Sequence, residues 1–160
     1  MAVSIFARIG TIQGESQDAK HKDEIEVLSW SWGVSQSGTI LHGGGGGGEG
    51  RASFADFNFT HYLDKASPLL MTACATGEHI KDATITVRKA GEDEREYLVI
   101  QMTDVLVTSV STSGSEGETP MEAVALAFAK VDLQYTPQNS DGSLEAVVQF
   151  TYDLMANRRG

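Results

Sequence analysis

The stretch with the most suggestive chemistry is ILHGGGGGGEGR, residues 40–51, in which six consecutive glycines precede Glu49, Gly50 and Arg51. Glycine-rich loops bind phosphate groups because their backbone N–H groups can approach an anion closely. The phosphate-binding loop of nucleotide hydrolases ends in Gly-Lys-Ser or Gly-Lys-Thr, however, and neither ending follows this run. The sequence therefore favours a structural loop over a phosphate site.

A second candidate, GESQD at 14–18, is similar to a serine nucleophile elbow in its first four positions. Asp18 then stands where the tight strand-to-helix turn of such an elbow requires glycine. A polar loop that hydrogen-bonds its own backbone is the better interpretation.

The titratable side chains also lack catalytic or metal-binding spacing. No two histidines are four residues apart, and the acids near predicted element ends form no carboxylate pair. Cys74 lies on an apolar helical face and suits a small buried side chain. We therefore predict no enzyme, no catalytic residue, no metal site and no cofactor. The side chains concerned are His21, His42, His61, His79, Asp64, Asp82 and Asp104.

Composition restricts the function further. Asp and Glu number 22 against 12 Lys and Arg, so the net charge of −10 repels nucleic acid. The single cysteine excludes an internal disulfide. The sequence has no basic N-terminal segment followed by an apolar run, and no stretch of about 20 apolar residues. We expect folding in the cytoplasm, no membrane insertion by the chain itself, and any export by dedicated machinery without a signal peptide.

The elements that must position these residues are mostly strands. Seven segments alternate with a period of two and are rich in Val, Ile, Thr and aromatic residues, and turn-forming residues separate them. These predicted strands are 2–9, 24–36, 51–62, 83–90, 95–112, 121–135 and 145–155.

One helix interrupts the strands, in SPLLMTACATG. Ser67 is a suitable N-cap residue, and Pro68 suits the first helical position, where its missing N–H has no cost. Gly77 can end the helix in the left-handed conformation. We predict a single domain over residues 1–160 with a mainly β fold. It is a compact β-barrel of two antiparallel sheets with one short flanking α-helix at about 67–76 and a long Gly-rich loop at about 38–51.

The faces of the predicted strands differ in side-chain size. Leu28, Trp30, Trp32 and Val34 share one face that suits a core, and Ser29, Ser31, Gly33 and Ser35 lie opposite. Small residues in such a row either let another layer approach or line a smooth surface. The segment 95–112 has apolar residues on both faces, which the helix or another subunit could cover.

Five ordered blocks of sequence resemble the haemolysin-coregulated protein family, Hcp, whose members are inner-tube subunits of the bacterial type VI secretion system. The resemblance runs from about residue 3 to residue 152 and includes the glycine-rich loop. The blocks are GESQDAKHKDEIEVLSWSWG (14–33), LDKASPLLMTACATG (63–77), ITVRKAG (85–91), YLVIQMTDVLVTSVSTSGS (97–115) and FAKV…YTPQNSDGS (128–143).

The resemblance implies a homo-hexameric ring that stacks into a hollow tube inside a contractile sheath on a baseplate, capped by the VgrG spike. It further implies secretion of the tube protein, and small effector proteins carried and stabilised in the lumen. Because the chain stops soon after the last strand, we expect no fused C-terminal toxin domain. Two other classes stay open: a monomeric ligand-binding β-sandwich, lectin-like or lipid-binding, and a small hydrolase.

Two sets of residues are expected to carry the tube function. We expect Ser29 and Ser31 to face the lumen and its effectors. We also expect the glycine-rich loop to contact a neighbouring ring, because a glycine run is costly to order without external contacts. The residues of this stacking loop are Leu41, His42, Gly43, Gly44, Gly45, Gly46, Gly47, Gly48, Glu49, Gly50 and Arg51.

Overall fold

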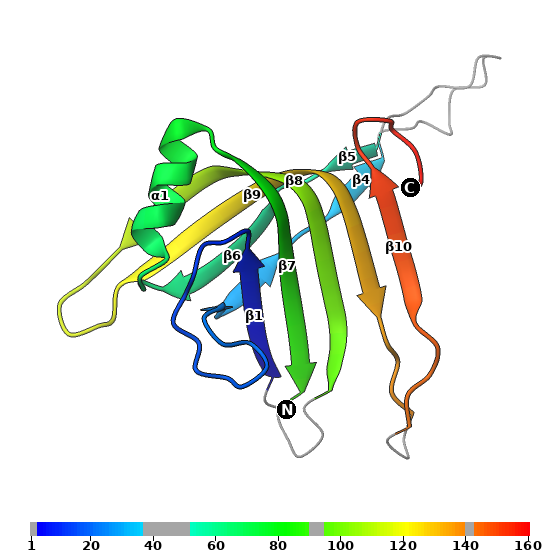
Figure 1. Cartoon of the computed structure of the whole chain (residues 1–160), viewed down its shortest axis with the longest axis horizontal. Helices are drawn as coiled ribbons and strands as arrows, with labels where there is room; N and C mark the ends of the chain where they lie inside the picture. The colour runs from blue at the N-terminus through cyan, green and yellow to red at the C-terminus, as the bar shows by residue number, and fades with distance from the viewer. Residues whose placement is uncertain (1–2, 37–51, 90–94, 140–142) are drawn as a thin grey trace.

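The computed structural model describes residues 3–36, 52–89, 95–139 and 143–160, and everything below refers to these ranges. Strands dominate them, and one helix lies against the sheet near one end (Figure 1). The strands are β1 (Val3–Ile9), β2 (Ile25–Glu26), β3 (Ser29–Ser31), β4 (Val34–Gln36), β5 (Ala52–Phe54), β6 (Phe57–Tyr62), β7 (His79–Lys89), β8 (Glu96–Ser113), β9 (Met121–Tyr135) and β10 (Val148–Asp153), and the helix is α1 (Ser67–Thr76).

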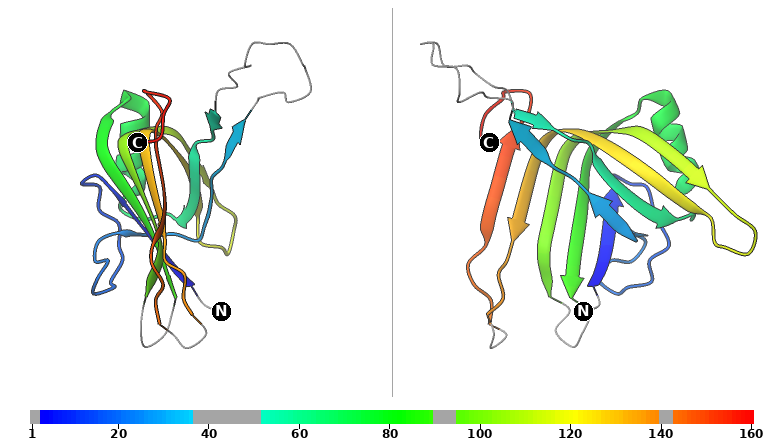
Figure 2. Two further views of the ribbon diagram at one scale, coloured as in Figure 1. Left: turned by 90° about the vertical axis from the view of Figure 1, so that its right-hand side faces the viewer. Right: turned by 180° about the vertical axis from the view of Figure 1, so that it is seen from behind.

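All strand pairs are antiparallel. The main sheet has eight strands and runs in the order β2-β1-β7-β8-β9-β6-β3, with β10 paired to the end of β9 that β6 leaves free. β4 and β5 form a separate two-stranded sheet, which stands beside the curled main sheet (Figure 2). The predicted fold class, a mainly β barrel-like fold of two antiparallel sheets with one short helix, is confirmed.

A change of hydrogen-bonding partner closes the main sheet. Residues of β2 pair with β1, and the N–H of Val27 still donates to the carbonyl of Ile5 at 2.9 Å. The N–H of Leu28 then donates to the carbonyl of Thr60 at 2.8 Å, and β3 continues along β6. One segment of chain therefore joins the two edges of the sheet.

This crossover corrects the prediction of one strand over 24–36, which consists of β2, β3 and β4. The prediction of one strand over 51–62 is likewise wrong, because the chain leaves β5 at Phe54 and joins β9 only from Phe57. Elsewhere the predicted strands are confirmed with shifted ends. β7 begins earlier than predicted, at His79, and the last strand is limited to Val148–Asp153.

Buried apolar side chains fill the space inside the barrel. Phe57, Ile85, Leu126 and Leu70 of α1 are all 0% exposed, so four different elements contribute to one core. Alternation along a strand places such residues on a common face. The described part of the chain contains no helix with the length and apolarity needed to cross a membrane.

The two-sided apolar pattern of β8 has a structural cause. The buried residues of β8 are even-numbered up to Met102 and odd-numbered from Val105 to Val107. Asp104, which has a left-handed φ of 56°, lies at this change. The register of β8 against β9 shifts again at Thr108, which lies between the paired residues Val107 and Ser109. Each irregularity changes which alternate side chains face the core.

The helix ends as predicted but begins differently. Gly77 has φ 65°, and its N–H donates to the carbonyl of Cys74 at 3.3 Å, so the predicted left-handed end is confirmed. The predicted N-cap is wrong, because the cap position is Ala66 and Ser67 already belongs to the helix. The Ser67 hydroxyl instead accepts a hydrogen bond from the backbone N–H of Asp64 at 3.2 Å.

Candidate functional site

Ser29 and Ser31 belong to a surface of small uncharged side chains on the outer side of the barrel wall. Strand register aligns this surface in two rows that cross β3, β6, β9 and β8. Most of its members are exposed, whereas Thr60 is half-buried and Ala125 is buried. We call it the small-residue face; it consists of Ser29, Thr60, Ala123 and Ser111 in one row and Ser31, Asn58, Ala125 and Ser109 in the other.

The tryptophans lie on the opposite side of the wall, as predicted. Trp30 stacks on Phe57 with ring centroids 5.7 Å apart, and Trp32 meets Phe128 edge-on at 5.9 Å. Both indoles are half-buried against the core. Their bulk inside the barrel leaves the smaller alternate residues on the outside.

Two neighbours of the tryptophans were also predicted to face the core, and that prediction is wrong. Leu28 is 42% exposed, because it lies where the chain crosses between sheet edges. Val34 is 53% exposed, because it belongs to the two-stranded sheet and not to the barrel wall.

The chemistry of the small-residue face is that of hydroxyl, amide and methyl groups. Ser29 and Thr60 join their hydroxyl oxygens across the strand pair at 2.6 Å. A shallow depression over this part of the face is lined by Ser31, Asn58 and Ala123 among others. Such groups can form hydrogen bonds with a passing molecule, and none of them is an acid, a base or an activated nucleophile.

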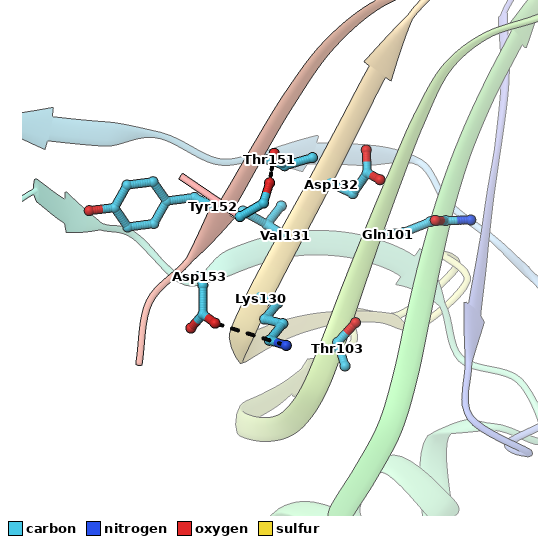
Figure 3. Close-up of a pocket in the computed structure, with 9 residues that line it drawn as sticks. Gln101, Thr103, Lys130, Val131, Asp132, Thr151, Tyr152 and Asp153 are labelled. Carbon is cyan, nitrogen blue, oxygen red and sulfur yellow. Dashed lines mark hydrogen bonds and ion pairs between the residues drawn. The ribbon is translucent and has the colours of Figure 1, made fainter. Parts of the chain in front are cut away.

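A larger depression lies between β8, β9 and β10 (Figure 3). Several polar groups in and beside it are paired. Lys130 Nζ lies 3.9 Å from Asp153 Oδ2, the amide of Gln149 donates to both oxygens of Asp132 at 2.9 and 3.0 Å, and the Thr151 hydroxyl donates to the carbonyl of Gly160. The pairing of these groups is typical of a surface network that ties the C-terminal strand to the barrel.

The histidines of the described ranges each lie beside carboxylates, which the sequence did not reveal. His21 contacts Glu24 and Glu96, His61 contacts Glu122, and the exposed His79 lies 3.1 Å from Asp104. The partners of His21 and His61 include residues 75 and 61 positions away in the chain, so no local motif could have shown them. Within the described ranges, no three His, Cys, Asp or Glu side chains form a group that could hold a metal ion.

The pair of His61 and Glu122 is fully buried, with both side chains 0% exposed and 2.9 Å between Nε2 and Oε1. Asp64 Oδ2 lies 3.7 Å from the other ring nitrogen, Nδ1. Burial alone lowers the pKa of His61, but the carboxyl groups of Asp64 and Glu122 together outweigh burial and raise this pKa above its ordinary value of 6.5. The folded protein therefore favours the protonated ring.

The predicted stacking loop, 41–51, lies outside the described residues, and with it His42. Of the predicted functional residues, the structure thus describes Ser29 and Ser31, which it brings together on one exposed surface. The remaining members of the small-residue face were not predicted, because the register that aligns them is not visible in any one strand.

Residues 6–135 match the family described as "Type VI secretion system effector, Hcp". The chain belongs to the Hcp family. It is 49% identical over 160 residues to "Protein hcp1" of Pseudomonas aeruginosa, and the match covers 98% of each chain. The resemblance inferred from the five sequence blocks is therefore confirmed, and with it membership of a family of type VI secretion tube proteins.

Solved Hcp structures share the fold. The structure of Hcp1 from Salmonella typhimurium is 40% identical with a TM-score of 0.82, and 99% of each chain is covered. Another structure, described as a type six secretion system protein, is 27% identical with a TM-score of 0.92 and is covered over 99% of this chain and 100% of its own. The curled antiparallel sheet and the smaller second sheet are thus those of Hcp proteins.

The buried histidine of this Hcp chain predicts a specific pH dependence of stability. Because folding raises the pKa of His61, its protonation stabilises the fold, fully below pH about 6.5 and progressively less as the pH rises through the folded-state value. Glu122→Gln removes one carboxylate that raises this pKa. The variant should be less stable by about 1–3 kcal/mol below pH about 6.5, and the difference should narrow at higher pH.

Urea unfolding of both proteins at a series of pH values and one protein concentration measures this difference. His79→Gln is the matched control, because that histidine is 70% exposed beside Asp104 and its loss should change stability little at any pH. A stability difference for Glu122→Gln that is constant over the whole pH range, or that widens with rising pH, would contradict the inference that protonation of His61 stabilises the fold.

Proposed function

We propose that the chain is the structural subunit of the inner tube of a type VI secretion system. In this proposal six copies form a ring, rings stack into a hollow tube, the tube is itself secreted without a signal peptide, and its lumen carries or stabilises small effectors. Its other partners are then the VgrG spike, the contractile sheath and the baseplate, which the family membership suggests.

The observation that carries the proposal is the small-residue face. Its eight side chains are short and uncharged in a chain of which 21% of residues are charged. A channel wall must leave room for cargo and must not trap it by charge, and such a face meets both needs. Ser29 and Ser31 would then face the lumen, with the tryptophans anchoring the wall from behind.

Exposed apolar side chains support assembly. Leu69 of α1 is 50% exposed, and Val148 and Phe150 of β10 are 62% and 37% exposed. β10 pairs with β9 on one side, and on its other edge Asp153 bridges to Arg158, so the part of that edge before Asp153 can accept a further strand or side chains. Exposed apolar side chains on a strand and on a helix, as on β10 and α1, are typical of surfaces that neighbouring subunits cover.

The proposal predicts the oligomeric state of the purified protein. Light scattering should give the mass of about six chains, and negative-stain images should show six-fold rings with an open centre. A stable monomer at high concentration would instead favour the ligand-binding β-sandwich, and measurable turnover abolished by one substitution would favour the hydrolase.

We also propose that the loop 41–51 contacts the neighbouring ring in a stack. Removing three of its six consecutive glycines should leave single rings intact and reduce tube length or secretion, because a shortened loop cannot reach its partner. Images of tubes and the amount of secreted protein measure the effect. Tube assembly that proceeds unchanged would make the loop a simple connection.

The lumen assignment predicts the effect of bulk at Ser31. Ser31→Trp should leave rings intact, because the residue is exposed, and should weaken effector retention about tenfold or more by occupying the wall. Ser31→Ala is the matched control and should retain effector nearly as the wild type does. Co-purification of effector with intact rings is the measurement. Failure of Ser31→Trp to form rings would show that this face is buried between subunits.

A further inference from the structure

Residues 10–24, which we call the strap, connect β1 with β2 (Figure 1, dark blue). The strap covers side chains of β1 and β7 that point away from the barrel core. Phe6 and Arg88 are 4% and 6% exposed, although they alternate with the core residues Ala7 and Val87. The burial of this outer surface therefore depends on how the strap is attached.

His21 of the strap lies at the centre of the attachment. Its ring stacks on Phe6 with centroids 4.4 Å apart. Its Nδ1 lies 2.6 Å from Glu24 Oε2 within the strap, and its Nε2 lies 2.7 Å from Glu96 Oε1 of β8. An ionised carboxylate can only accept a hydrogen bond, so two carboxylates on the two ring nitrogens suit the imidazolium form, in which both nitrogens donate.

Further contacts hold the strap and do not depend on a histidine, among them a hydrogen bond from the N–H of Gly10 to the carbonyl of Asp82 at 2.9 Å. Asp18 and Arg88 pair through two hydrogen bonds, of which Nη1 to Oδ1 measures 3.0 Å, and the guanidinium lowers the pKa of Asp18 to about 2. Glu15 Oε2 accepts a hydrogen bond from the backbone N–H of Lys65 at 2.9 Å. Among these attachments, only the contacts of His21 involve a histidine, the type of side chain whose charge changes between about pH 5 and pH 8.

We propose that His21 is a pH-sensitive latch, which holds the strap to Glu96 while the ring is protonated and releases it when the ring becomes neutral. The charged groups that contact the imidazole ring are Glu24 of the strap and Glu96 of β8, and Asp18 accepts a hydrogen bond from the backbone N–H of His21 at 3.2 Å. Arg88 itself lies over the Phe6 ring, 4.9 Å from its centroid.

Loss of one ring proton replaces a donor with a lone pair that faces a carboxylate, so one of the two short contacts changes from attraction to repulsion. The Asp18–Arg88 pair remains, and the strap then opens around it and uncovers Phe6. This latch does not depend on the proposed tube function, because all its groups belong to one chain.

Hydrogen exchange of the full-length protein tests the latch. The reporters are the N–H groups of Gly14, Asp23 and Glu24, which donate within the strap at 2.7, 2.9 and 3.2 Å. Their protection factors, corrected for base-catalysed exchange, should fall about tenfold or more between pH about 5.5 and about 8.5, which corresponds to one charge-assisted hydrogen bond. Amides in the β8–β9 core should keep their protection.

Variants distinguish the latch from general pH effects. His21→Gln should have low strap protection at both pH values. Glu96→Gln keeps the imidazole ring of His21 and alters a side chain that is already 38% exposed. It should reduce the fall in strap protection between the two pH values while leaving the fold intact. His79→Gln should retain the whole wild-type fall. Strap protection that is independent of pH in the wild type, or an unchanged fall in both His21→Gln and Glu96→Gln, would overturn the proposal.

Discussion

The structure depends on the crossover at Val27 and Leu28. Consecutive backbone N–H groups there donate to opposite edges of the curled sheet, Val27 to β1 and Leu28 to β6. Closing the sheet in this way satisfies groups that would otherwise form two open edges. Because the same few residues continue into β3, the crossover also sets which side chains of β3 face inward, and therefore where Ser29 and Ser31 lie.

Much of the fold could be predicted from the sequence, since alternation of apolar residues identifies strands and Gly77 marks the end of the helix. The breaks within strands could not be predicted. The pattern of Leu28, Trp30, Trp32 and Val34 alternates without interruption, yet the chain changes its hydrogen-bonding partner from β6 to β5 along it. Choice of partner is a property of the whole sheet and leaves no mark on local alternation.

The same distinction applies to the small-residue face. That Ser29 and Ser31 share one side of a strand could be predicted, because one strand contains both with tryptophans opposite. Ser109 and Ser111 are aligned with them only through the register of three strand pairs, β3 with β6, β6 with β9, and β9 with β8. In the last of these pairs, Thr108 shifts the register by one residue. The contacts of His21 with Glu96 and of His61 with Glu122 also join residues far apart in the sequence, and a histidine in a loop does not indicate which strand it will reach.

Within the described residues, β4 and β5 pair with each other and with no strand of the main sheet. Aromatic rings connect it to the barrel: Trp32 and Phe54 pack against Phe150, and Phe54 also meets Tyr152 with centroids 4.9 Å apart. The two-stranded sheet is therefore held to the barrel by side-chain packing and by two short covalent links, since two residues separate β3 from β4 and two separate β5 from β6. A substitution that shrinks one of these rings would weaken the packing between the two sheets without breaking any backbone hydrogen bond of the barrel wall.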